Sequence, residues 1–203
     1  MKIICIGRNY ADHVKEMNSP ENEDPVFFLK PDTALLLRNR PFYYPDYSKN
    51  IHYEAELVIR IDRNGKHIRE AFAHDYYSEI GFGLDMTARD LQQKCKKNGA
   101  PWEIAKGFDS SAPLSRFIPL SDLKNVENIE FSLKKNGEVV QHGFSKDMIF
   151  SVDRIIAHVS KYITLKMGDI IFTGTPSGVG PVQIGDRLEG FIEDKKMLST
   201  LIK

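Results

Sequence analysis

The sequence has few cysteines, and their arrangement limits the chemistry that they can support. Its 203 residues include two, Cys5 and Cys95, which lie far apart and outside any CxxC pattern. This arrangement argues against a disulfide framework and against a zinc site made of thiolates. We expect both side chains to be small buried apolar groups or inert thiols.

The chain also lacks an excess of either charge and any long apolar run. Lys plus Arg number 28 and Asp plus Glu number 28, so the formal net charge is zero. No overall field then favours nucleic acid or an anionic membrane, and any anion site must be local. The opening stretch MKIICIG is too short for the apolar region of a signal peptide, and no stretch approaches membrane-spanning length. We expect a cytoplasmic protein without nucleic-acid or membrane partners.

Short strands dominate the hydrophobic pattern. Side chains alternate in character over residues 52–61, which predicts a half-buried strand. Asn64-Gly65 and Asn136-Gly137 are dipeptides typical of type I′ hairpins. The second hairpin would join two of the other predicted strands, and antiparallel pairing is therefore expected. These other strands are residues 2–6, 80–84, 130–135, 138–144 and 169–173.

Three helices are predicted between these strands, at residues 10–17, 88–97 and 152–162. Their N-cap residues would be Asn9, Thr87 and Ser151, and Asn98-Gly99 would end the second helix. The polar residues 18–25 are predicted to form a surface loop. Because regular βαβ alternation is missing and 203 residues can bury one core, we expect a single β-rich α+β domain over residues 1–203.

Three carboxylates form a candidate metal site. Glu54 and Glu56 occupy alternate positions of one strand, so they project from the same face about 7 Å apart. Asp85 follows the apolar run 80–84, where a buried carboxylate needs a counter-charge. Such oxygen ligands suit Mg²⁺ or Mn²⁺ and argue against zinc or copper. His52 could form a hydrogen bond that orients one of the metal ligands, or it could have a purely structural role. A solvated strand face is the alternative interpretation of Glu54 and Glu56.

Other residues are candidates for acid–base chemistry and for anion binding. His13 and Glu16 share one helix face and can form an oriented base, although an exposed ion pair has the same spacing. Lys106 lies between apolar pairs and would need an anionic partner such as a substrate carboxylate, unless it snorkels to the surface. Residues 174–178, GTPSG, offer N–H groups and hydroxyls to an anion, but a plain turn explains them equally well.

The chain resembles the fumarylacetoacetate hydrolase family, in particular its short single-domain branch of acylpyruvate hydrolases and oxaloacetate decarboxylases. The resemblance covers nearly the whole chain and is carried by five ordered segments. These are GRNYADHVKEM at 7–17, HYEAE at 52–56, GLDMTARDLQ at 83–92, GAPWEIAKGF at 99–108 and GDIIFTGTPSGVG at 168–180. Gly107 and Asp109 depart from the residues commoner beside the active-site lysine, which leaves substrate preference open.

The resemblance implies a fold, a metal and a set of site residues. The fold would be a mixed β-sandwich roll of the family's C-terminal-domain type, usually assembled as a homodimer. The ion would be Mg²⁺ or Mn²⁺, with Ca²⁺ as a substitute, bound by Glu54, Glu56 and Asp85. The residues that carry over are His13 and Glu16 as the His–Glu dyad, Lys106 as the active-site lysine, and Arg89, Gln92 and Thr175 as substrate contacts.

The implied activity is hydrolysis of a C–C bond in acylpyruvate-type 2,4-dioxo acids, through a metal-bound pyruvate enolate. The same enolate chemistry would serve an oxaloacetate decarboxylase, or a tautomerase or isomerase of a 2-oxo or 2-hydroxy-dienoate acid, and the intact dyad favours hydrolysis. A non-enzymatic protein stapled by its metal is the contrasting hypothesis. Residues 8–25 are a candidate lid over the small 2-oxo acid substrate.

Overall fold

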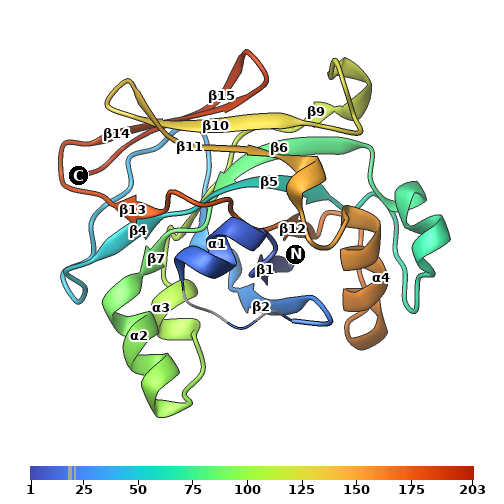
Figure 1. Cartoon of the computed structure of the whole chain (residues 1–203), viewed down its shortest axis with the longest axis horizontal. Helices are drawn as coiled ribbons and strands as arrows, with labels where there is room; N and C mark the ends of the chain where they lie inside the picture. Colours follow the sequence, from blue (N-terminus) through green and yellow to red (C-terminus); the bar gives the residue numbers. More distant parts are fainter. Residues whose placement is uncertain (18–19, 21) are drawn as a thin grey trace.

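A six-stranded sheet forms the central layer of the protein (Figure 1). The computed structural model describes residues 1–203 except residues 18, 19 and 21. Within the sheet β1 and β12 run parallel, and the other neighbours run antiparallel. The strand order is β2 (Val26–Lys30), β1 (Ile3–Gly7), β12 (Ile170–Phe172), β5 (Ala55–Arg60), β6 (Glu79–Leu84) and β9 (Ile118–Pro119).

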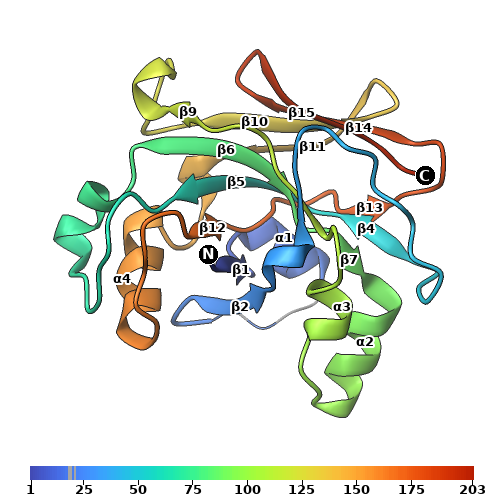
Figure 2. The same ribbon diagram turned by 180° about the vertical axis from the view of Figure 1, so that it is seen from behind.

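A four-stranded antiparallel sheet lies against one part of this layer, at the top of Figures 1 and 2. Its order is β11 (Glu138–Phe144), β10 (Glu130–Lys135), β14 (Arg187–Ile192) and β15 (Lys195–Leu201). The hairpin prediction at Asn136-Gly137 agrees with the structure, since both residues have the positive φ that a type I′ turn needs, 54° and 91°. The other hairpin prediction is wrong, because Gly65 forms a bridge with Leu165 and β5 pairs with β6 only after a longer connection.

Two smaller sheets complete the strands of the described residues. One contains β13 (Gly180–Pro181), β4 (Ile51–Tyr53) and β7 (Thr87–Ala88), and the other pairs β3 (Leu35–Leu36) with β8 (Ala112–Pro113). The short strands β4 and β7 lie at the end of the six-stranded sheet where β5 begins and β6 ends. The candidate metal residues lie at that end.

Apolar side chains fill both faces of the central sheet. Leu57 and Phe82 pack with Phe131 and other residues of the four-stranded sheet, while Ile59 joins a cluster beneath α4. The opposite face carries a third cluster that includes Val58 and Phe172. The two sheets approach closely at Gly190, where an added Cβ would lie 2.1 Å from the Phe82 ring. Only glycine permits that contact.

The helices lie at the ends and sides of the sheets. They are α1 (Ala11–Glu16), α2 (Arg89–Asn98), α3 (Glu103–Lys106) and α4 (Val152–Tyr162), with 3-10 turns η1 (Asp32–Ala34), η2 (Glu70–Tyr76), η3 (Leu120–Asp122) and η4 (Ser145–Asp147). Of the helices in the described residues, none has both the length and the apolar character that crossing a bilayer requires. The β-rich α+β class predicted from the sequence is confirmed.

One of the three predicted N-caps is present. The Ser151 hydroxyl accepts a hydrogen bond from the backbone N–H of Arg154, and Gly99 ends α2 with φ 61°. The caps predicted at Asn9 and Thr87 are wrong, because α1 and α2 begin without a side-chain cap. Asn9 instead bonds to distant backbone, and the Thr87 hydroxyl donates to the carbonyl of Asp85. A tertiary partner therefore outcompetes capping at Asn9, and a local carbonyl outcompetes it at Thr87.

The segment predicted as one half-buried strand, residues 52–61, also differs. It forms β4 and β5 with a break at Glu54, and β5 is buried on both faces, with Glu56 1% and Val58 0% exposed. Both faces of β5 are covered by side chains from segments distant in sequence. The alternation of residues within one strand cannot indicate such a cover. The predicted loop 18–25 and the predicted lid 8–25 include residues 18, 19 and 21, so both lie partly outside the described residues.

Candidate metal centre and acid–base pair

The three acids singled out in the sequence converge at the end of the central sheet. Glu54 lies between β4 and β5, Glu56 is on β5, and Asp85 directly follows β6. The backbone N–H of Asp85 donates to the Glu54 carbonyl at 2.8 Å, which holds the two strand ends together. One carboxylate oxygen from each acid lies within 4.8 Å of the others, and all three residues are buried. The interpretation as a solvated strand face is therefore wrong.

Cations compensate two of these acids. Lys106, the last residue of α3, donates to Glu54 Oε2 and to Asp85 Oδ2, both at 2.7 Å. Arg89, at the start of α2, donates to Glu54 Oε1 at 2.6 Å. Burial would raise the pKa of Glu54, but Lys106 and Arg89 outweigh it and hold that pKa well below its usual range. Glu54 is therefore ionised.

Lys106 is itself buried and was predicted to need an anionic partner. Burial acts to lower the pKa of Lys106, but Asp85 and Glu54 raise it above its ordinary value. Its ammonium is thus charged and bridges two of the candidate metal ligands. The alternative of a lysine that snorkels to the surface is excluded by this burial.

Glu56 is the least compensated of the three acids. Its Oε2 accepts a hydrogen bond of 2.7 Å from the backbone N–H of Gly174. Burial, together with the charges of Asp85 and Glu54, raises the pKa of Glu56 well above its ordinary value. Gly174 has φ 102°, and an added Cβ would lie 2.7 Å from the Cβ of Asn9, so glycine is required for this N–H to reach the carboxylate.

This donor set fits a hard divalent cation. Glu56 has no ion pair among the described residues. The buried oxygen Oδ1 of Asp85 forms an ion pair with the Lys30 ammonium at 2.8 Å, but no group in the described residues donates a hydrogen bond to it. A bound cation would supply the charge that Glu56 lacks and a partner for that oxygen. Carboxylate oxygens without thiolates in the cluster favour Mg²⁺ or Mn²⁺ over softer metals.

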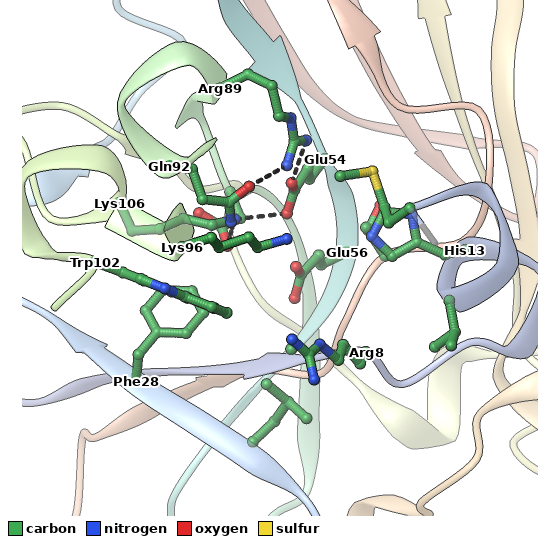
Figure 3. Close-up of a pocket in the computed structure, with 16 residues that line it drawn as sticks. Arg8, His13, Phe28, Glu54, Glu56, Arg89, Gln92, Lys96, Trp102 and Lys106 are labelled. Atoms are coloured by element: carbon green, nitrogen blue, oxygen red, sulfur yellow. Dashed lines mark hydrogen bonds and ion pairs between the residues drawn. The ribbon is translucent and has the colours of Figure 1, made fainter. Parts of the chain in front are cut away.

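The predicted acid–base pair lies beside these acids. His13 Nδ1 and Glu16 Oε2 are 3.0 Å apart, and the other Glu16 oxygen accepts a bond of 3.1 Å from the N–H of Gly178. His13 lines the same pocket as Glu54 and Glu56, and Figure 3 shows its ring turned toward them. His13 is 8% exposed, so the simple surface ion pair is excluded for this residue. The pair can orient the imidazole as a base.

The three predicted substrate contacts also line this pocket. Arg89 Nη1 donates to Gln92 Oε1 at 2.7 Å, which fixes both side chains on α2. Thr175 Oγ1 accepts a bond of 2.9 Å from the amide of Gln141 on β11. The same Gln141 accepts from the backbone N–H of Ala55 at 2.9 Å and thereby connects the metal strand to the loop after β12. His52 bonds to Asn50 at 2.9 Å, and among the described residues it has no hydrogen bond or ion pair with the three acids.

Two residues that the sequence reasoning missed support the site from behind. Lys30 is buried, and its ammonium also donates to Ser111 Oγ at 3.0 Å and to the carbonyl of Lys106. It ends the apolar run of residues 26–29, a signal close to the apolar neighbours that identified Lys106. Asn9 accepts from the N–H of Phe150 and donates to the carbonyls of Phe150 and Thr173 at 2.7, 3.1 and 2.8 Å. No local signal distinguishes this bridge from an N-cap.

Comparison with known proteins identifies the family. A model described as fumarylacetoacetate (FAA) hydrolase C-terminal matches residues 2–201. The chain belongs to the fumarylacetoacetate hydrolase family. The resemblance inferred from five sequence segments is thereby confirmed, and the acids, the dyad and Lys106 lie on four of them. Its members include enzymes, which makes the pocket a candidate active site.

Proteins similar to this chain include oxaloacetate tautomerases and a fumarylpyruvate hydrolase. Oxaloacetate tautomerase FAHD1, mitochondrial, of Mus musculus is 49% identical over 191 residues, which are 94% of this chain and 86% of that protein. Oxaloacetate tautomerase YcgM of Escherichia coli is 45% identical over 188 residues, 92% and 86% of the two chains. A fumarylpyruvate hydrolase from Pseudomonas aeruginosa, solved with Mn²⁺ and pyruvate, has TM-score 0.94 and 39% identity over 100% of this chain and 89% of that one.

Proposed function

We propose that this protein is a divalent-metal-dependent enzyme that interconverts the enol and keto forms of oxaloacetate. The observation that supports it is one pocket that joins three buried acids with His13, whose ring is bonded to Glu16. Relatives at 49% and 45% identity are named oxaloacetate tautomerases. This choice places a tautomerase, one of the predicted alternatives, ahead of the predicted hydrolase. Its substrate is oxaloacetate in place of the dienoate acid that the sequence prediction gave for a tautomerase.

The chain's own residues supply binding and proton transfer in this proposal. A divalent cation on Glu54, Glu56 and Asp85 would act as a Lewis acid that draws electron density from the 2-oxo group. Arg89, Gln92 and Thr175, which all line the pocket, would hold the carboxylate end of the substrate. Mg²⁺ and Mn²⁺ both suit these ligands, and Ca²⁺ would be a substitute.

His13 moves the proton at C3. In the enol-to-keto direction, the enol hydroxyl releases its proton to solvent and the protonated His13 delivers one to C3. His13 then regains a proton from solvent, so the reaction is balanced. Glu16 orients the ring through Nδ1, and Lys106 places a positive charge beside the 2-oxygen as negative charge develops there.

The predicted hydrolysis of acylpyruvates is the second candidate. It is favoured by the His13–Glu16 pair, which is able to deprotonate water, and by the likeness to a fumarylpyruvate hydrolase. Water activated by His13 would attack the distal carbonyl, and cleavage of the adjacent C–C bond would release a carboxylic acid and pyruvate. Oxaloacetate decarboxylase activity would release CO₂ and pyruvate from the same pocket.

A substrate panel separates these reactions. Oxaloacetate enol absorbance, pyruvate release from oxaloacetate, and pyruvate release from acetylpyruvate and fumarylpyruvate are followed with Mg²⁺ and with EDTA. We expect rapid loss of enol absorbance with Mg²⁺, abolished by EDTA. Faster turnover of an acylpyruvate than of oxaloacetate would make the hydrolase the principal activity, and turnover unaffected by EDTA would contradict the metal site.

We further propose that residues 1–203 act as one catalytic domain that assembles as a homodimer. The match of the family model to residues 2–201 supports a single domain. Light scattering on the purified chain tests the dimer. The cytoplasmic location stays a prediction, since some relatives are named mitochondrial.

A further inference from the structure

Two cations in the pocket take no part in compensating the metal acids. Arg8 directly follows β1, and Lys96 lies on α2. Both line the pocket that contains Glu54, Glu56 and Asp85. Figure 3 shows their nitrogen ends directed into the pocket, on either side of Glu56 in that view. Arg8 reaches the pocket from the end of β1, and Lys96 reaches it from α2, which packs against the helix α3 that carries Lys106.

Neither cation has a carboxylate partner within the described part of the chain. The three acids already pair with Lys30, Arg89 and Lys106 or bind a backbone N–H. Arg8 donates a long hydrogen bond of 3.4 Å to the neutral side chain of Asn22. Lys96 lies over the ring of Trp102 at 5.8 Å. Two positive charges are therefore available to an anion that enters the pocket.

These two charges also act on each other. Burial, followed by the charge of Arg8, lowers the pKa of Lys96 from its ordinary value. The Lys96 residue as a whole is exposed, so its end lies at the mouth of the pocket. Like charges that face each other across a pocket repel, and an anion placed between them removes the repulsion.

The backbone at Arg8 sets the direction of its side chain. Arg8 has φ 60°, a left-handed conformation that is costly for a residue with a Cβ. The next residue, Asn9, is fully buried and holds the turn through three hydrogen bonds to Phe150 and Thr173. This strained turn is what directs the Arg8 side chain toward the acids. A glycine or asparagine would relieve the strain and would lose the cation.

We propose that Arg8 and Lys96 form a second anion subsite that receives the substrate carboxylate distal to the 2-oxo group. The pocket then selects dianionic 2-oxo acids over monoanionic ones of equal length. This inference rests on the proposed function, because it assumes that the 2-oxo acid end is held at the acids and Arg89. A C4 dicarboxylate such as oxaloacetate carries its second charge on the carbon chain beyond the 2-oxo group, as the subsite requires.

Turnover of a charged and an uncharged substrate tests the subsite. Oxaloacetate is compared with its 4-ethyl ester, which keeps the 2-oxo acid and lacks the distal charge. The variants are Arg8→Met, Lys96→Met and their combination, with Lys97→Met as a control on the same helix outside the pocket lining. We expect each single change to raise KM for oxaloacetate about 10-fold and the double change about 100-fold, from loss of charge-assisted hydrogen bonds.

The ester, kcat and a conservative variant show whether the effect comes from the distal charge of the substrate. Constants for the ester should stay within about twofold in every variant, kcat should change little, and Arg8→Lys should recover most of the lost affinity. Equal loss for oxaloacetate and the ester, or no loss for either, would overturn the proposal. Met is as strained as Arg at φ 60°, and a thermal midpoint shows whether each variant is folded. Lys96→Met changes an exposed side chain and remains informative if Arg8→Met fails to fold.

A binding measurement keeps this inference separate from the proposed function. Calorimetric titration of the Mg²⁺-loaded protein compares malate, a dianion, with 2-hydroxybutanoate, a monoanion of the same chain length. We expect the wild type to prefer malate, and Arg8→Met and Lys96→Met to lose that preference. If oxaloacetate is not turned over but the preference is found and lost as expected, the proposed function fails and the subsite stands. Equal affinity of the wild type for both acids would refute the subsite whatever the enzyme catalyses.

Discussion

At the scale of single residues, the site depends on an unequal distribution of compensation among its acids. Glu54 is paired with Lys106 and Arg89, and its pKa is held low, whereas Glu56 has one backbone N–H and a raised pKa. A buried charge without a partner costs free energy unless a cation binds it. Glu56 is therefore the residue at which the metal hypothesis is most sharply tested.

Replacing Glu56 with Gln is expected to abolish metal-dependent turnover and leave the fold intact. Removing an uncompensated buried carboxylate should leave the metal-free thermal midpoint unchanged or raised. Mg²⁺ should raise the free energy of unfolding of the wild type by about 2.7 kcal/mol at 100 times Kd, and this gain should disappear in the variant. The measurement is a thermal melt with and without Mg²⁺, beside an activity assay. Loss of the folded state in the variant, and in the wild type with EDTA, would instead support the protein stapled by its metal.

The His13–Glu16 pair makes a second residue-scale prediction. His13→Gln should lower kcat by about 10²–10⁴-fold, since general acid–base catalysis is lost while the pocket stays folded. Glu16→Gln should have a smaller effect, because it removes the orientation of the ring and leaves the imidazole. Steady-state kinetics measure both, with oxalate affinity as the control for an intact metal site. An unchanged kcat in His13→Gln would exclude it as the proton carrier.

At the scale of elements, turns and strand ends are held by side chains that reach across the molecule. Asn9 connects the turn after β1 to the segment before α4 and to the end of β12. It also packs against Gly174, whose N–H binds Glu56. One buried amide thus positions both Arg8 and the loop that supports the metal acids.

Asn9→Ala should therefore cost more stability than the loss of an ordinary cap. It leaves the Phe150 N–H and two carbonyls without their partners, and we expect a loss of about 2–4 kcal/mol in the free energy of unfolding. Ser151→Ala removes a true N-cap and should cost about 1 kcal/mol. Urea denaturation of both variants makes the comparison. Equal losses would mean that Asn9 contributes no more than a cap.

At the scale of the whole molecule, β1 and β12 pair with each other although they lie near opposite ends of the chain. Asp169, immediately before β12, accepts hydrogen bonds from the backbone N–H groups of Lys2 and Lys166 at 2.7 and 2.8 Å, and it pairs with the Lys2 ammonium at 2.5 Å. Burial opposes ionisation, but these donors lower the pKa of Asp169 below its ordinary value. The carboxylate thereby fixes the register of the parallel pair.

A lowered carboxyl pKa stabilises the fold above the unfolded pKa of about 3.9 and loses that contribution as the pH falls through the folded value. Asp169→Asn should therefore reduce the free energy of unfolding near pH 7 by about 1.5–3 kcal/mol. The difference from the wild type should shrink steadily below about pH 4. Chemical denaturation across pH 3–7 tests this, and a pH-independent difference would refute the electrostatic explanation.

Local patterns determined much of this protein from the sequence alone. Alternation located β5, helical spacing located α4, an apolar run located β6, and the Asn136-Gly137 dipeptide located the hairpin of β10 and β11. All of these signals depend on neighbouring residues. The spacing of Glu54 and Glu56, with Asp85 after an apolar run, identified the acids that converge, and the ordered segments identified the family. His13 and Glu16 are three residues apart on one helix, so their contact was also predictable.

Tertiary structure alone decided which partners these side chains meet. Whether Asn9 capped a helix or bridged to Thr173, and whether β5 was covered on both faces, depended on segments more than a hundred residues away. Lys106 pairs with two acids because the end of α3 lies beside the end of β6. Arg8 and Lys96 likewise line the pocket because of where the end of β1 and the helix α2 lie in space. The physical reason is that hydrogen bonds and charges act over a few ångströms, and chain folding sets those distances.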